Sequence, residues 1–213
     1  MAISMHAVST SLSGFMLGFV LLFSAACSQQ EQKQDAKQDG LVQSEQQEQE
    51  QMQQEQPFGG EEDAAFANAL WKEMEQSNLV GESRIVNSEP YKGAPPHGMI
   101  LDVSEQKITV SGIEGDLVVK RNYGGDGLTV EDVRNDPAKY LEAVTIMFKR
   151  EDGYDDENRN WFYAKYQPDG TIMKNPKGVL LAGRVAKGAP TGCISCHKSA
   201  PGGDYLYTHD RFK

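Results

Sequence analysis

Residues 116–123 read Asp-Leu-Val-Val-Lys-Arg-Asn-Tyr, and this stretch indicates the class of fold. Its β-branched and aromatic residues favour a β-strand. Because side chains alternate between the two faces of a strand, Val118 and Lys120 share one face, whereas Leu117 and Val119 share the other. Apolar residues on both faces indicate a strand that is largely buried.

Stretches of the same kind recur on both sides of it. Each is short, rich in β-branched and aromatic residues, and bounded by Gly, Pro, Asn or Asp, which favour turns. We therefore predict strands at 84–87, 98–103, 107–111, 116–123, 143–149, 160–166 and 171–173. The segment Gln-Pro-Asp-Gly at 167–170 predicts a turn before the last of them.

An amphipathic helix is expected before the strands. Phe66, Leu70 and Met74 recur every four residues, and the acidic segment 61–63 suits the positive end of a helix dipole. This pattern predicts a helix at about 63–77.

A second helix is expected near 129–141, where Thr129 is a suitable N-cap. The sequence therefore predicts an α+β fold that is mainly an antiparallel β-sheet. An N-terminal amphipathic helix, the second helix near 129–141 and a short C-terminal segment complete it.

The charge of the chain is strongly acidic. Its 213 residues include 21 Lys and Arg against 31 Asp and Glu, which gives a formal net charge of −10. No cluster of basic residues is available to displace counterions from nucleic-acid phosphates. The sequence therefore predicts no nucleic-acid partner.

The N-terminus has the pattern of an export signal. Residues 12–23 are apolar but too few for a spanning helix, and they lead into Ser-Ala-Ala-Cys at 24–27. This pattern resembles a bacterial lipoprotein signal, which predicts a signal peptide over 1–26 and lipidation of Cys27. We then expect an exported protein, anchored to a membrane surface on the periplasmic side by its lipid. An ordinary cleaved signal peptide is the alternative.

The segment 27–57 is composed mostly of Gln and Glu. It contains too few apolar residues to offset the entropy of ordering the chain. We predict a disordered tether over 27–57 and one folded domain over 58–213.

Residues 193–197 read Cys-Ile-Ser-Cys-His, the pattern that attaches haem covalently. The thiols of Cys193 and Cys196 would bind the two vinyl groups of one porphyrin, and His197 would ligate the iron. A structural zinc site needs four protein ligands, and the domain has no third cysteine once Cys27 is set aside. A redox dithiol normally follows a strand near the start of a βαβ unit, whereas this motif lies near the end of a β-rich chain. The C-terminal segment is therefore predicted to bind one haem c per chain.

Several further segments, taken in order, resemble the cytochrome P-460 and cytochrome c′-beta family. They are Pro96-His97-Gly98, 117–123, 146–150 with Gly153-Tyr154, 160–166 and 182–188, followed by Cys193-x-x-Cys196-His197, Asp204-Tyr205 and Thr208. The resemblance covers 63–212. It implies a homodimeric, largely β-sheet c-type cytochrome with five-coordinate iron and an open distal face.

Lys120 matches the lysine that hydroxylamine-oxidising members of the family link covalently to the porphyrin. Gas-binding relatives carry a lysine there without the bond, so the residue alone does not predict a cross-link. The alternatives are a Lys120 that reaches solvent or pairs with a carboxylate.

The oxidising members also place a carboxylate over the distal face of the iron, where it can accept protons. Our alignment puts Met147 there, and a thioether cannot act as a base. A distal pocket walled by Met147, Phe148 or Phe162 would favour small neutral diatomic molecules. Because Met147 and Phe148 point to opposite faces of their strand, only one of them can face the pocket. Ordinary core packing of Met147 is the alternative.

Two other polar residues have weaker assignments. Arg184 is a candidate partner for a haem propionate or the pocket edge, because a guanidinium pairs bidentately with carboxylates. A surface salt bridge is its alternative. His97 is expected to be a turn residue hydrogen-bonded to backbone.

Three functions are compatible with these residues. The first is a pentacoordinate haem protein that binds nitric oxide or a related small nitrogen species. The second is an oxidoreductase that oxidises hydroxylamine or nitric oxide with a haem cross-linked to Lys120. The third is an electron-transfer cytochrome with Met99, Met147 or Met173 as sixth ligand. The expected partners are a small nitrogen-oxide ligand, an electron-transfer protein, a membrane surface and a second copy of the chain.

Overall fold

The computed structural model describes residues 57–85 and 88–207. The predicted signal peptide, Cys27 and residues 27–56 of the predicted tether lie outside the described residues. Those that are described belong to one unit of the chain, 49–213. Among them, no helix has the length and apolar character needed to cross a bilayer.

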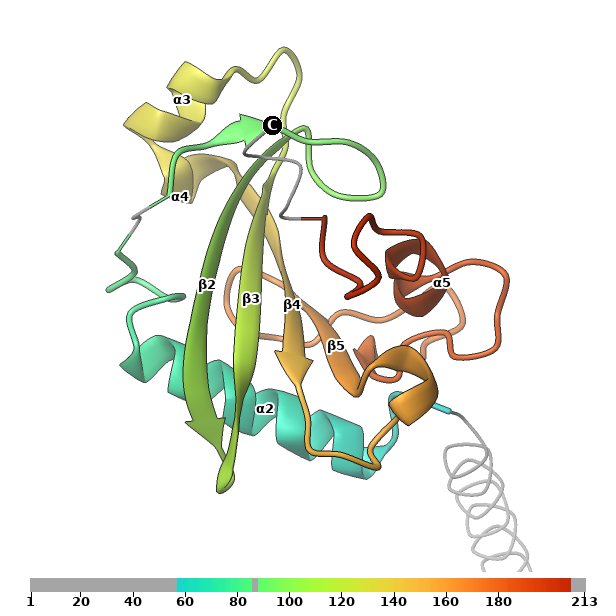
Figure 1. Cartoon of the computed structure of the whole chain (residues 1–213). Coiled ribbons are helices and arrows are strands. Elements are labelled where there is room, and N and C mark those ends of the chain that lie inside the picture. Colours follow the sequence, from blue (N-terminus) through green and yellow to red (C-terminus); the bar gives the residue numbers. More distant parts are fainter. Residues whose placement is uncertain (1–56, 86–87, 208–213) are drawn as a thin grey trace, which may run out of the picture. The chain divides into compact units, whose positions relative to one another are not determined.

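Six antiparallel strands form one sheet in sequence order, so each strand pairs with its neighbours along the chain (Figure 1). They are β1 (Tyr91–Lys92), β2 (Ile100–Val110), β3 (Ile113–Tyr123), β4 (Leu141–Lys149), β5 (Trp161–Tyr166) and β6 (Ala182–Gly183). Strand β3 lies between β2 and β4 and is buried on both faces along most of its length. The predicted α+β fold with a mainly antiparallel sheet is confirmed.

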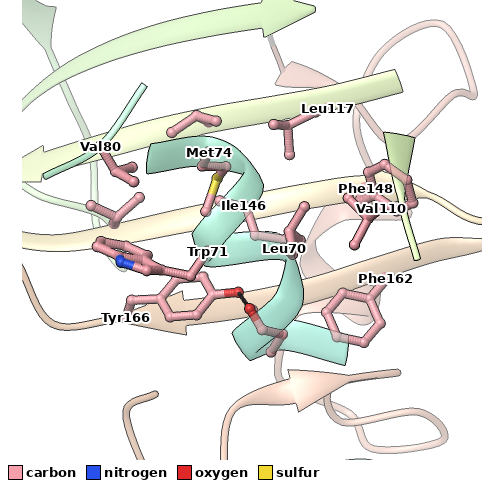
Figure 2. Close-up of a cluster of buried hydrophobic side chains, with 14 of the residues drawn as sticks. Leu70, Trp71, Met74, Val80, Val110, Leu117, Ile146, Phe148, Phe162 and Tyr166 are labelled. Atoms are coloured by element: carbon pink, nitrogen blue, oxygen red, sulfur yellow. Dashed lines mark hydrogen bonds between the residues drawn. The ribbon is translucent and has the colours of Figure 1, made fainter. Parts of the chain in front are cut away.

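Helix α2 (Glu61–Gln76) covers one face of the sheet, called here the helix face. Its acidic first turn is favoured at a helix N-terminus. Leu70, Trp71 and Met74 of α2 pack against sheet residues that include Phe148 and Phe162 (Figure 2). The amphipathic helix predicted at 63–77 is therefore present and begins two residues earlier.

One hydrogen bond joins α2 to the sheet within this apolar cluster. The Tyr166 hydroxyl of β5 donates to the Ala67 carbonyl oxygen of α2 at 2.8 Å, which Figure 2 marks with a dashed line. Because Tyr166 is fully buried, its hydroxyl would otherwise lose its hydrogen bond to water without replacement. The bond thus fixes α2 on the sheet.

A buried ion pair lies on the helix face. Arg121 of β3 and Asp102 of β2 are direct partners in the sheet, and both side chains are fully buried. Arg121 Nε and Nη2 donate to the Leu79 carbonyl oxygen at 3.1 and 2.7 Å, while the Tyr123 hydroxyl donates to Asp102. This network joins the segment after α2 to the centre of the sheet.

The predicted second helix is present as two short helices, α3 (Val130–Asn135) and α4 (Pro137–Tyr140). Thr129 is the N-cap of α3 and forms a capping box with the third residue of that helix. The break falls before Pro137, which has no N–H for an intrahelical bond but fits the first position of a new helix.

The opposite face of the sheet, called here the cavity face, is covered by the C-terminal part of the chain. Val118, Met147 and Tyr163 of this face pack with Ile194 and Tyr205. Ile194 belongs to α5 (Cys193–His197), and a short 3-10 helix, η1 (Asp156–Asn158), precedes β5. Figure 1 shows α5 and the segment after it, in red, beside β5.

Two strand predictions need correction. The stretches 98–103 and 107–111 belong to one continuous strand, β2, because backbone hydrogen bonds to β3 continue through the exposed residues between them. Arg84 and Ile85 lie in irregular backbone, and residues 86–87 are not described.

The end of the predicted strand series also differs. Residues 171–173 contribute one isolated bridge, between Tyr166 and Ile172. The turn predicted before it is confirmed, since the Gly170 N–H donates to the Gln167 carbonyl oxygen at 3.0 Å. Strands β1 and β6 were not predicted, because two residues are too few to show an alternating pattern.

Candidate functional site

A cavity of about 550 Å³ opens on the cavity face of the sheet, close to α5. Sites for small molecules and cofactors typically measure about 300–1,000 Å³. The lining side chains come from three parts of the chain: Val118, Lys120, Thr145, Met147, Tyr163 and Lys165 of the sheet, Pro96 and His97 of the loop before β2, and Leu181, Val185, Cys193, Cys196, His197, Leu206 and Tyr207 of the C-terminal part.

All three residues of the predicted haem motif line this cavity. Cys193 and Cys196 are free thiols on α5, and His197 follows at the end of the same helix. Burial raises the pKa of the Cys193 thiol to about 11. At neutral pH this thiol is therefore protonated, and it points no charge into the cavity.

The imidazole of His197 is held in one orientation. Its Nδ1–H donates to the Tyr205 carbonyl oxygen at 2.7 Å, so Nε2 keeps its lone pair for a ligand bond. The rings of Tyr163 and Tyr207 pack edge-on against it, with centroids 5.6 and 5.5 Å away. Burial lowers the pKa of His197, which favours the neutral form that binds metals.

Gly192, directly before the motif, is required by the backbone. Its φ of +135° lies in the region that residues with a side chain rarely adopt. A Cβ atom at this position would also lie 2.2 Å from the Cβ of Ala186. The glycine therefore lets α5 begin directly against the loop that follows β6.

The sheet contributes two rows of side chains to the cavity wall. Val118, Met147 and Tyr163 are register partners on β3, β4 and β5 and form the apolar row. Lys120, Thr145 and Lys165 form the adjacent polar row. The structure thus places both Lys120 and Met147 at the cavity, and Val118 shares the face of Lys120, as the alternation predicted.

His97 also lines the cavity, which the sequence interpretation missed. Its Nδ1 lies 3.0 Å from Asn122 Oδ1, and its ring centroid lies 6.2 Å from that of His197. Burial, with a smaller contribution from the nearby charge of Lys120, lowers the pKa of His97 to about 4. His97 is therefore a neutral imidazole at physiological pH.

A haem fits these residues on chemical grounds. Two thiols and an imidazole with a free Nε2 are the donor set of covalent haem attachment. The Tyr163 hydroxyl is buried without a hydrogen-bond partner among the described residues, which indicates a missing neighbour at the cavity. Lys120 and Lys165 supply cations that suit the two propionates of haem.

The expectation that Phe148 and Phe162 line the pocket is wrong. Both side chains are fully buried on the helix face, against α2 (Figure 2). Phe148 and Phe162 are register partners on β4 and β5, and each is the chain neighbour of a cavity-face residue, Met147 or Tyr163. Because neighbouring residues of a strand face opposite ways, Tyr163 takes the position that Phe162 was expected to fill.

The assignment of Arg184 to the pocket edge is also wrong. Gly183 pairs with Tyr163, whose side chain lies on the cavity face. The side chain of the next residue, Arg184, therefore points to the helix face. There the Arg184 guanidinium lies 5.7 Å from the centre of the Tyr154 ring. Arg184 is absent from the cavity lining, whereas Lys120 and Lys165 are part of it.

Carboxylates are absent from the described residues that line the cavity. Glu142 of β4 and Glu151, two residues after that strand, are not part of the wall. The ionisable groups of the wall are instead the two lysines, the two histidines, the tyrosines and the two thiols. The site therefore has an apolar floor with a cationic edge.

The comparison with known families agrees with this geometry. The family model of cytochrome P460 matches residues 106–208, a stretch that runs from the middle of β2 through α5. Neither the curated proteins nor the solved structures gave a match. The matched stretch contains Lys120, Met147 and the whole motif at 193–197, whereas His97 precedes it. Residues 106–208 therefore form a cytochrome P460 domain, which confirms the family resemblance predicted from the sequence.

Proposed function

We propose that this protein is a c-type cytochrome that carries one haem on Cys193 and Cys196 and binds nitric oxide, or a related small nitrogen species, at its iron. Family membership implies a c-type haem protein. The observation that carries the finer proposal is the composition of the cavity wall beside His197, which includes the apolar row of Val118 and Met147 and has no carboxylate among its described residues.

The residues of the wall have distinct tasks in this proposal. The haem supplies an iron centre that binds a diatomic ligand. His197 holds that iron through Nε2, and the Tyr205 carbonyl fixes the plane of its ring. Val118 and Met147 exclude water from the cavity, because both are nearly fully buried and offer no hydrogen bond of ordinary strength. A neutral diatomic molecule loses little hydration on entry and is favoured over charged or strongly hydrated substrates.

The setting of the protein is proposed from its sequence. The pattern around Cys27 supports export to the periplasmic side and a lipid anchor on a membrane surface. The family resemblance supports a homodimer, and the redox chemistry of a haem iron is compatible with an electron-transfer partner. These assignments complete the proposal but do not determine the chemistry of the cavity.

The lack of a carboxylate among the described residues of the cavity wall predicts how the protein treats hydroxylamine. Oxidation of hydroxylamine requires proton removal, which a positioned base typically accelerates by about 10²–10⁴-fold. We expect the wild-type protein to bind nitric oxide yet show no sustained turnover of hydroxylamine with an added electron acceptor. Turnover of many equivalents per haem would contradict the proposal.

A second candidate function is an oxidoreductase for hydroxylamine or nitric oxide with a cross-linked haem. It is favoured by one observation, the position of Lys120 on the wall of the same cavity as His197. The charge of Lys120 is close enough to both His97 and His197 to lower their pKa values. A lysine so placed is within the site where a bond to the porphyrin would form.

Mass analysis of a proteolytic digest distinguishes the two candidates. If the haem is cross-linked, the peptide that contains Lys120 will be recovered attached to the haem peptide, and the ferrous Soret band will be shifted to the red. Lys120→Arg keeps the charge but should remove both signals. Under the nitric-oxide proposal, wild type and Lys120→Arg should give the same peptides and the same band.

A further inference from the structure

The segment that follows α5 folds back onto the histidine that ends this helix. His197 Nδ1–H donates to the carbonyl oxygen of Tyr205, only eight residues later in the chain, at 2.7 Å. The Tyr205 side chain is buried, and it packs in the same apolar cluster as Trp161 of β5. The contacts that shape the turn at Tyr205 therefore decide how this carbonyl meets the imidazole.

Tyr205 has a backbone conformation that residues with a large side chain rarely adopt. Its φ is +70°, which lies in the left-handed region. Such a conformation is strained for an aromatic residue, and it persists only where the surrounding contacts impose it. The strained residue here is the one whose carbonyl oxygen holds the ring of His197.

Two hydrogen bonds hold the two peptide planes on either side of Tyr205. Trp161 Nε1–H donates to the Asp204 carbonyl oxygen at 3.0 Å, and this oxygen lies in the plane before Tyr205. The Leu206 N–H donates to Asp204 Oδ1 at 3.1 Å, and it shares the plane after Tyr205 with the oxygen that accepts from His197. Because φ describes the rotation between these planes, the two bonds together maintain the strained turn.

Trp161 is a rigid donor for this purpose. Its side chain is almost fully buried, and its register partner on β4 is Lys149, whose amino nitrogen lies 5.2 Å from the centre of the Trp161 ring. Trp161 shares the cavity face with Tyr163, two residues later on β5. Trp161 itself is absent from the cavity lining, so it reaches His197 only through the turn.

A hydrogen bond from Nδ1 raises the basicity of a metal-ligating imidazole, and such outer partners tune the metal. We propose that Trp161 is a positioning residue that sets the strength of the bond between His197 and the haem iron, through the turn at Asp204 and Tyr205. This inference rests on the proposed haem site. It also gives a task to Trp161 and to the Asp204-Tyr205 pair, which the family resemblance includes but to which it assigns no role.

Loss of the indole donor has a definite consequence. Without it the peptide plane before Tyr205 is free to turn, and the strained φ can relax to a negative value. The Tyr205 carbonyl then moves away from His197, and the imidazole becomes less basic. A less basic imidazole binds iron more weakly and stabilises the ferric state less, so the reduction potential rises.

Resonance Raman spectra and the reduction potential of the holoprotein test this proposal. Trp161→Phe removes the indole N–H but keeps an aromatic ring in the apolar cluster. We expect the iron–histidine stretching band of the ferrous variant at lower frequency than in wild type, and its reduction potential to be higher. Trp71→Phe is the matched control, because Trp71 is the other tryptophan of the chain and is buried on the helix face. Both readouts should keep their wild-type values in Trp71→Phe.

A second variant acts on the other side of the same turn. Asp204→Ala removes the oxygen that accepts from the Leu206 N–H but keeps the carbonyl to which Trp161 donates. Asp204 is only half-buried, so this change is mild for the fold. We expect both readouts to shift in the same direction as in Trp161→Phe. If Trp161→Phe does not fold, Asp204→Ala decides, and wild-type readouts in it overturn the proposal.

The outcomes separate this inference from the proposed function. Wild-type values of both readouts in Trp161→Phe overturn the role of Trp161, and so does an equal shift in Trp71→Phe. Either result leaves the proposed function standing if the wild-type protein binds nitric oxide. A wild type that carries haem but binds no nitric oxide overturns the proposed function alone, since the shifts in Trp161→Phe still report on the bond at His197.

Discussion

Replacing Cys193 and Cys196 together by serine should abolish covalent haem attachment. Both thiols lie on α5 at the wall of the cavity, and a serine hydroxyl does not form the thioether bond to a vinyl group. When the chain is produced with haem-attachment machinery, the intact mass of the double variant should equal that of the polypeptide. Wild type should carry the additional mass of one haem.

The chain offers a matched control for this experiment. Cys27 is the third cysteine, and it lies far from the motif in sequence. Cys27→Ser should retain the full haem mass while losing the mass of any lipid. Retention of covalent haem by the Cys193→Ser, Cys196→Ser double variant would show that the attachment site is elsewhere.

Breaking the buried ion pair of the helix face should cause the largest loss of stability. Asp102 and Arg121 are both fully buried, and Arg121 also holds the Leu79 carbonyl oxygen. Asp102→Asn would leave the guanidinium charge without its counter-charge, which typically costs about 3–5 kcal/mol. Chemical denaturation of the holoprotein should show this loss as a lower midpoint.

An exposed ion pair on neighbouring strands provides the comparison. Lys107 and Asp116 are both more than half exposed, and their charges are well solvated. Asp116→Asn should leave the denaturation midpoint unchanged within error. If Asp102→Asn were equally silent, the ion pair would not be the element that joins the segment after α2 to the sheet.

The sequence was most informative where a pattern repeats over many residues. The four-residue spacing of Phe66, Leu70 and Met74 predicted α2, and the alternating stretch 116–123 predicted the core of β3. Strands β1 and β6 have two residues each and carry no period. Their pairing depends on neighbours that are distant in sequence, which local patterns do not report.

In the candidate site, too, local sequence patterns were predictive, and contacts between distant segments were not. The motif at 193–197 is contiguous, so its three residues were identified from the sequence, and the structure places all of them at one cavity. The alternation of side chains along the strand predicted that Met147 and Phe148 point to opposite faces of the sheet. It did not predict which of the two faces carries the cavity. That choice is made by α2, whose apolar stripe covers Phe148 and Phe162.

His97 shows what a local interpretation omits. Its surroundings in sequence, Pro-Pro-His-Gly, are typical of a turn, and the His97 N–H does donate to the Ala94 carbonyl oxygen at 3.1 Å. The contact that holds its ring at the cavity wall is with Asn122, which lies 25 residues away. Only the pairing of β3 with its neighbours brings that amide to the loop.

The central claim is that the iron beside this cavity binds nitric oxide, and titration of the ferrous holoprotein with nitric oxide tests it most directly. Absorption and electron paramagnetic resonance spectra would be recorded on a sample whose covalent haem content is known from its intact mass. We predict a saturable nitrosyl adduct with one nitric oxide per chain. Ferrous spectra that do not change at saturating nitric oxide would contradict the account.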